Sequence, residues 1–91
     1  MNPRTQIEAL AGALSRRGFM TTVFAKGGHQ RHPCVRITNR HASRLSEDIY
    51  AAADRDGQWW FWWSWAQRIA SINEIEKVAD AIAYVLDPSA Q

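Results

Sequence analysis

The sequence predicts an α+β fold, a four-stranded antiparallel meander with an N-terminal and a C-terminal helix packed on one face. Segments with helical periodicity lie at the two ends of the 91-residue chain, and short β-rich segments with turn signals lie between them. Two amphipathic helices bury their apolar sides together when both pack on the same side of such a sheet. The predicted order is α-β-β-β-β-α in a single domain, 1–91, and the other face of the sheet stays open.

The first helix is predicted at 3–17. Its apolar residues recur at helical spacing: Ile7, Leu10, Ala11 and Leu14. Thr5 and Glu8 have the spacing of a capping box, in which each side chain bonds a backbone N–H of the first turn. Gly18 has the position and residue type of a helix C-terminal cap.

The second helix is predicted at 71–87. Ser71 and Glu74 again have the spacing of a capping box. One apolar stripe follows: Ile75, Val78, Ala79, Ile82, Val85 and Leu86. Pro88 cannot continue a helix, so the helix is expected to stop at Asp87.

Two strands are predicted before the middle of the chain. The segment 19–25 is rich in β-branched and aromatic residues. The segment 34–39 alternates, with Val35 and Ile37 on one side and polar residues on the other. The second strand therefore contributes a polar side to the open face.

The segment around 44–54 carries two conflicting signals. Its alanine run and its cap residue favour a helix. The tight-turn sequence from Asp54 to Gly57 stands directly before the tryptophan-rich segment and calls for a hairpin partner. We therefore predict a strand at 47–53, because an unpaired aromatic strand at a sheet edge invites aggregation.

The fourth strand, 58–65, contains all five tryptophans of the chain within seven positions. Side chains alternate along a strand, so Trp60 and Trp62 point away from their neighbours Trp59, Phe61 and Trp63. A small domain needs only one of these faces for its core. The other face requires cover from a partner, a ligand, another protomer or long surface side chains, and the pattern does not say which set is buried.

Composition and charge narrow the class of protein. The chain is 46% hydrophobic and 22% charged, as in soluble globular proteins, and no apolar run is long enough to cross a bilayer. The single cysteine, Cys34, fits a reducing compartment, and a cytoplasmic location is expected. Residues 1–46 carry 8 − 1 = +7 charges and residues 47–91 carry 3 − 8 = −5. Such polarity indicates either a surface that binds polyanions or mutual attraction of the two halves.

Neither a metal site nor a catalytic site is predicted. Four residues offer zinc-ligand chemistry: His29, His32, Cys34 and His41. Their spacing matches no standard zinc motif, and neighbouring arginines repel a cation. The glycine pair at 27–28 lacks the residues of a phosphate-binding loop, and no nucleophile or metalloprotease motif occurs. No cofactor is therefore expected, and an enzyme would require a site shared with another protomer.

The segment Gly57–Ile69, with Thr38–Arg40 and Leu45–Tyr50 before it, resembles a group of short, mostly uncharacterised actinobacterial proteins. The resemblance covers most of the chain, from the first helix to the second. It implies a bacterial cytoplasmic protein. No activity or catalytic residue is attached to that group, so the resemblance implies no mechanism.

The predicted function is that of a small non-catalytic interaction module, which uses the open face for self-association or for docking to a protein partner. Its predicted contact residues are Arg36, Thr38, Arg40, Trp60 and Trp62. Aromatic residues and arginine are enriched at protein interfaces. If the arginines instead lie over the tryptophan rings of the same chain, they cover the face themselves.

Two other functions use the same residues. Single-stranded nucleic acid binds to aromatic side chains by stacking and to basic side chains through phosphates, and Lys26, Arg31 and Arg44 are the candidates for the second role. The chain lacks the signature and element order of an RNA-recognition motif, and its acidic second half opposes polyanion binding. A third possibility is a small-ligand pocket or enzyme site walled by tryptophans.

Overall fold

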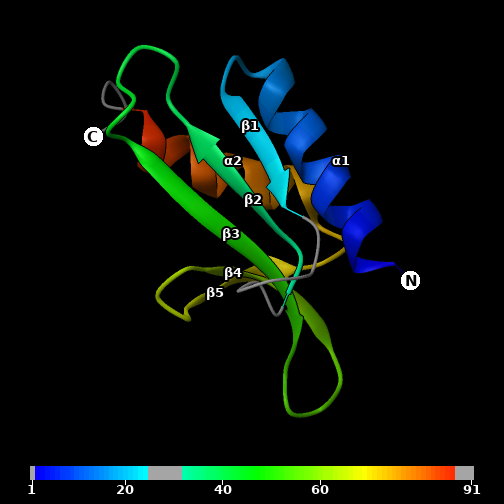
Figure 1. The fold of residues 1–91 in the computed structure, drawn as a ribbon. Helices are drawn as coiled ribbons and strands as arrows, with labels where there is room; N and C mark the ends of the chain where they lie inside the picture. Colours follow the sequence, from blue (N-terminus) through cyan, green and yellow to red (C-terminus); the bar gives the residue numbers. More distant parts are fainter. Residues whose placement is uncertain (1, 25–31, 88–91) are drawn as a thin grey trace.

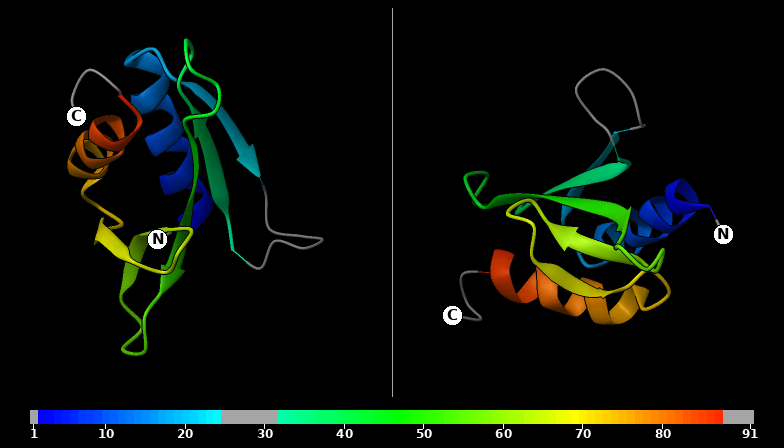
Figure 2. Two further views of the ribbon diagram at one scale, coloured as in Figure 1. Left: turned by 90° about the vertical axis from the view of Figure 1, so that its left-hand side faces the viewer. Right: turned by 90° about the horizontal axis from the view of Figure 1, so that it is seen from below.

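The chain forms one antiparallel sheet whose strands follow one another in sequence order, β1-β2-β3-β4-β5. The computed structural model describes residues 2–24 and 32–87. Its elements are α1 (Pro3–Arg16), β1 (Met20–Phe24), β2 (Cys34–Thr38), β3 (Ser46–Ala53), β4 (Trp59–Trp63), β5 (Arg68–Ser71) and α2 (Ile75–Leu86). Both helices lie on the same side of the sheet, behind it in the view of Figure 1 (Figures 1 and 2). We call this side the inner face and the opposite side the outer face.

The sheet has five strands, and the prediction of four was wrong. The chain turns at 64–66, so β4 ends at Trp63 and the chain returns as β5 beside it. The backbone N–H of Trp63 donates to the Gln67 carbonyl over 2.8 Å, and that of Ala66 donates to the Trp63 carbonyl over 3.0 Å. Ala66 takes φ +68°, a conformation that normally favours glycine. With alanine at this position, the second hairpin has no turn signal in the sequence.

The second helix begins at Ile75, later than predicted, and the capping box proposed for Ser71 and Glu74 does not form. Glu74 occupies the cap position but makes no side-chain capping hydrogen bond. Ser71 is instead the last residue of β5, where it pairs with Trp60. Sheet pairing therefore overrode the local helix-start signal.

The first helix begins at Pro3, and the capping box proposed for Thr5 and Glu8 is also wrong. The cap is Asn2, whose side chain accepts a hydrogen bond from the Arg4 backbone N–H over 2.9 Å. At the other end, Gly18 follows the helix with φ +93°, as its predicted capping role requires.

The hydrophobic core lies between the inner face and the two helices. Strand β4 contributes Phe61, which is fully buried, and Trp63, which is 8% exposed. The helices contribute Ile7, Leu10, Leu14, Val78, Ile82 and Leu86, and β2 and β3 contribute Val35, Ile37, Ile49 and Ala51. The apolar stripes of both helices are buried in this core. None of the described helices covers the outer face.

The oppositely charged halves of the chain attract each other within the fold. Arg17, from the basic half, bonds Glu76 at 3.0 Å and Asp80 at 2.8 Å on α2. Arg36 bonds Asp48 at 2.9 Å across β2 and β3. Part of the predicted polarity is therefore neutralised internally.

Candidate functional site

Strand pairing arranges the outer face in rows that run across the sheet. One row crosses all five strands and consists of Phe24, Cys34, Tyr50, Trp62 and Arg68. We call it the aromatic row. The next row toward the β3–β4 turn consists of Ala52, Trp60 and Ser71. Side chains directly opposite on neighbouring strands are in contact distance, so these residues form a continuous apolar band across β1 to β4, which ends at the polar residues Arg68 and Ser71 on β5.

The other half of the outer face is polar. One row holds Thr22, Arg36 and Asp48, and the row beyond it holds Met20, Thr38 and Ser46. The hydroxyl groups of Thr38 and Ser46 lie 2.9 Å apart and share a hydrogen bond. We call these the polar rows. Met20 is the exception in them, since it is a large apolar side chain that is 55% exposed.

Asp54 holds one end of the aromatic half in place. Its Oδ1 accepts the backbone N–H groups of Asp56 (2.9 Å) and Gln58 (3.0 Å), which shapes the β3–β4 turn. Its Oδ2 accepts the Trp60 indole N–H at 2.8 Å and lies 3.5 Å from the Arg68 guanidinium. Desolvation alone would raise the pKa of Asp54, but the bonds from Trp60, Gln58 and Asp56 and the charge of Arg68 outweigh it and lower the pKa below its usual value.

Two arginines lie over aromatic rings on either side of the face. The Arg68 guanidinium lies 4.5 Å from the centroid of the Trp60 ring and 5.9 Å from that of Trp62. The Arg36 guanidinium lies 5.3 Å from the centroid of the Phe24 ring. Each arginine also pairs with a carboxylate, Arg36 through two hydrogen bonds to Asp48. Both cationic groups are thus neutralised by partners on their own sheet.

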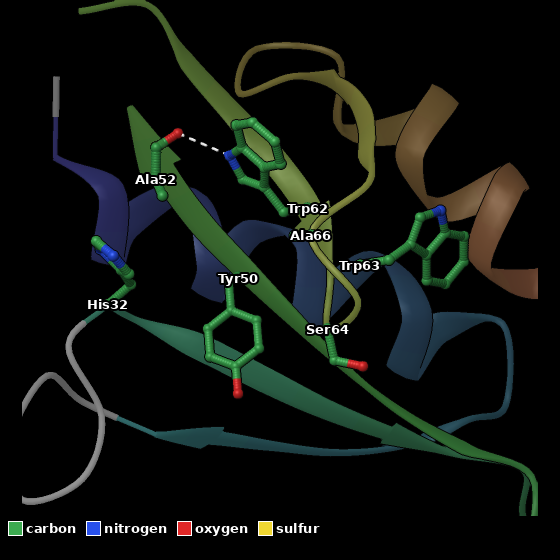
Figure 3. Close-up of a pocket in the computed structure, with 7 residues that line it drawn as sticks. All are labelled: His32, Tyr50, Ala52, Trp62, Trp63, Ser64 and Ala66. Carbon is green, nitrogen blue, oxygen red and sulfur yellow. Dashed lines mark hydrogen bonds between the residues drawn. The ribbon is translucent and has the colours of Figure 1, made fainter. Parts of the chain in front are cut away.

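An open pocket of about 280 Å³ lies beside Tyr50 and Trp62 (Figure 3). It is lined by His32, Tyr50, Ala52, Trp62, Trp63, Ser64 and Ala66. Figure 3 shows the Trp63 ring pointing away from the pocket toward α2, so Tyr50 and Trp62 supply its aromatic walls. The Trp62 indole N–H donates to the Ala52 carbonyl over 3.0 Å and is not available to an occupant. The pocket therefore offers an apolar floor with hydroxyl and imidazole groups at its rim.

The Cys34 thiol and the Tyr50 hydroxyl of the aromatic row are held in their neutral forms. Desolvation raises the pKa of the buried Cys34 thiol, and the charge of Asp48 raises it further against the opposing effect of Arg36. Desolvation likewise raises the pKa of the Tyr50 hydroxyl. A thiol with a raised pKa is a poor nucleophile, so Cys34 acts as an apolar strand residue.

The structure brings together four of the five predicted contact residues. Trp60 and Trp62 lie in the apolar band, and Arg36 and Thr38 lie in the polar rows of the same face. Arg40 does not join them, because it is exposed in the loop between β2 and β3.

The candidate nucleic-acid contacts are not gathered on the face. Arg44 is exposed in the same loop as Arg40. Lys26 and Arg31 lie outside the described residues. The described part of the structure therefore provides no basic track beside the aromatic row.

The candidate zinc ligands lie apart from one another. His32 precedes β2 and His41 follows it, so the length of the strand separates them, and His29 falls outside the described residues. In residues 2–24 and 32–87 no three histidine, cysteine or acidic side chains are placed to hold a metal ion.

Sequence reasoning missed Tyr50, Asp54, Arg68 and Met20. Tyr50 could have been assigned to the outer face, because the Asp54–Gly57 turn sets the register of β3 against β4. Arg68 could not, since its position depends on the turn at Ala66, which carries no glycine.

Comparison with protein-family models, with curated proteins and with solved structures gave no match to this chain. The resemblance to actinobacterial proteins thus stays a prediction. Of the helices in the described ranges, none is both long and apolar enough to cross a membrane.

Proposed function

We propose that this protein is a small non-catalytic interaction module that docks another protein on its outer sheet face. The observation that carries the proposal is the aromatic row, which crosses all five strands on the side away from the helices. Tyr50 and Trp62 stand side by side in its centre and wall a pocket. Aromatic anchors in such a pocket are the usual centre of a protein interface.

The charges on this face favour a protein over a nucleic acid. Arg36 is neutralised by Asp48, and Arg68 shares Asp54 with Trp60. A nucleic-acid phosphate would have to compete with these carboxylates and would meet their negative charge. A protein partner meets a face of balanced charge with an apolar centre, which is the composition of a protein interface.

The proposed place of action is the cytoplasm of a bacterium. A single, buried cysteine is typical of proteins from reducing compartments and supports this proposal. The module needs no cofactor for docking. The neutral Tyr50 side chain serves as contact area, and the buried Cys34 packs beneath the face.

Site-specific photocrosslinking in cells tests the proposal. A photoreactive amino acid replaces Thr22, which is exposed on the outer face, or Glu76, which is exposed on α2 as the matched control. We expect a discrete protein adduct from position 22 and none from position 76. The adduct should disappear when Trp62→Ala is added and should survive nuclease treatment.

Equal crosslinking from both positions, or none from position 22, would contradict docking on the outer face. An adduct removed by nuclease would assign the face to nucleic acid. Titration of single-stranded oligonucleotides against tryptophan emission checks that outcome directly, since stacking on Trp62 would change its emission.

A further inference from the structure

We propose that the partner is a second copy of this chain, packed outer face to outer face about a two-fold axis, with Met20 of each copy inserted into the pocket of the other. The inference rests on the proposed docking function and names its partner. It is carried by the position of Met20, by the position of the pocket, and by the charged pair that lies midway between them.

Met20 is the large apolar side chain that is most exposed on this face among the described residues. The structure shows three exposed large apolar side chains among the described residues: Met20, Trp65 and Tyr84. Trp65 stacks on Trp63, whose ring points toward α2, and Tyr84 lies on α2 itself. Met20 alone belongs to the outer face, because its neighbour Thr21 points inward and shares a hydrogen bond with Ser15 of α1.

The pocket matches a methionine in size and chemistry. An apolar cavity of about 150 Å³ holds a benzene molecule, so the pocket of about 280 Å³ has room for the Met20 side chain. Tyr50 and Trp62 provide ring edges and faces for the thioether sulfur, a favourable contact in proteins. An unbranched side chain also enters a shallow pocket without displacing its walls.

The strand pairing places the two-fold axis. Met20 lies on β1, and the pocket opens between β3 and β4, two rows farther along the sheet. The midpoint between them falls one row from Met20 and between β2 and β3, where Arg36 pairs with Asp48. A two-fold axis that lies between the two sheets, passes this midpoint and runs perpendicular to the line from Met20 to the pocket carries each Met20 to the other copy's pocket.

Residues at such an axis meet their own copies, so they must be self-complementary. Arg36 and Asp48 form a neutral pair, and two copies of it side by side bring each carboxylate near both guanidinium groups. A lone charge at the same place would repel its copy. The charge pattern at the midpoint therefore fits a second copy of this chain better than a partner with one sign of charge.

Mass measurement across a concentration series is the first test. Sedimentation velocity of the full chain from about 1 µM to about 500 µM should show a monomer that converts to a dimer. Met20→Ser should weaken the dimer about 100-fold, because each dimer loses two buried methionines. Tyr84→Ser, which changes a side chain of similar exposure on α2, should leave the dimer unchanged.

A charge exchange tests the axis. Arg36→Glu alone, or Asp48→Arg alone, places four like charges at the axis and should abolish the dimer. The double variant Arg36→Glu with Asp48→Arg restores neutral pairs in both copies and should restore it. Circular dichroism shows whether each single variant is still folded.

The outcomes separate this inference from the docking function. A wild-type chain that stays monomeric throughout the series, or a dimer that Met20→Ser leaves intact, overturns the two-fold arrangement. A Trp62-dependent adduct from position 22 whose mass is not that of two chains also overturns it, and leaves docking on this face standing. A dimer lost in both single charge variants and regained in the double variant supports it.

Discussion

The two sides of β4 carry the same kind of side chain but are covered by different means. On the inner face Phe61 and Trp63 are enclosed by two helices that the chain brings from its opposite ends. On the outer face Trp60 and Trp62 are half-buried, and their cover comes from within the sheet. Arg68 lies over both outer rings, and Asp54 and the Ala52 carbonyl accept their indole N–H groups.

This difference shows how a five-stranded sheet tolerates aromatic residues on both sides. The inner rings are removed from water by packing against the helices, and this burial of apolar surface stabilises the fold. The outer rings keep part of their surface in contact with solvent, and their polar atoms are satisfied locally. The outer face can therefore stand open in a monomer and still present apolar area to a partner.

The largest effect on stability should come from removing the Phe61 ring on the inner face. Phe61→Ala should reduce the free energy of unfolding by about 3–5 kcal/mol, because it empties a fully enclosed site in the core. Trp62→Ala removes a larger ring from the outer face but should reduce it by only about 1–2 kcal/mol, since that ring is already partly solvated. Urea unfolding followed by circular dichroism measures both, and equal losses would erase the distinction between the faces.

Asp54→Asn should have the next largest effect on stability, because Asp54 bonds the two residues Trp60 and Arg68 on the outer face. In the variant, the Trp60 indole N–H faces either the amide NH₂ group of asparagine, which cannot accept its hydrogen bond, or the neutral amide oxygen in place of the charged carboxylate. The pKa of Asp54 is lowered in the fold, so its contribution to stability is complete above the unfolded pKa of about 3.9 and is lost as the pH falls through the folded value.

We therefore expect wild type and Asp54→Asn to differ most in unfolding free energy near neutral pH and to converge as the pH falls below the lowered pKa of Asp54. Urea midpoints measured across this range provide the check. A difference that does not change with pH would mean that the carboxylate charge is not what holds Trp60.

Arg68→Gln should have a smaller effect. It removes the guanidinium from the faces of Trp60 and Trp62, a contact worth about 0.5–2 kcal/mol at half-exposed sites. Indole emission should shift to longer wavelength as water reaches the outer rings. Arg4→Gln on α1 provides a matched control, since Arg4 makes an exposed ion pair with Glu8 and no ring contact within residues 2–24 and 32–87. An unchanged emission spectrum would mean that Arg68 does not cover these rings.

The smallest effect should be a gain in stability. Ala66→Gly relieves the left-handed backbone at the β4–β5 turn and should stabilise the chain by about 0.5 kcal/mol, because part of the relief is offset by the extra freedom of glycine when unfolded. Gly57→Ala at the β3–β4 turn, where φ is +80°, should lower the unfolding free energy by a comparable or larger amount. Two changes of the same sign would contradict the view that both turns favour glycine at their left-handed positions.

Much of the fold was predictable because its signals are local. The turn at Asp54–Gly57 outweighed the alanine-rich helix propensity of the segment before it, and that segment is β3. The fifth strand was not predictable, because Arg68–Ser71 is short and its turn depends on an alanine in a glycine conformation. The two predicted capping boxes did not form. Asn2, three residues before Thr5, is the N-cap of α1, and Ser71 pairs with Trp60 in the sheet instead of capping α2.

The sequence by itself determined that one strand would present aromatic rings to both sides of a sheet, because side-chain alternation is a property of the extended backbone. It could not determine which rings face the helices, since that depends on where five strands and two helices meet. Only the tertiary structure decided that Arg68 and Asp54 converge on Trp60, that Tyr50 and Trp62 wall a pocket, and that Met20 shares their face. Those contacts join residues distant along the chain, and pairing register and packing set them, not local preference.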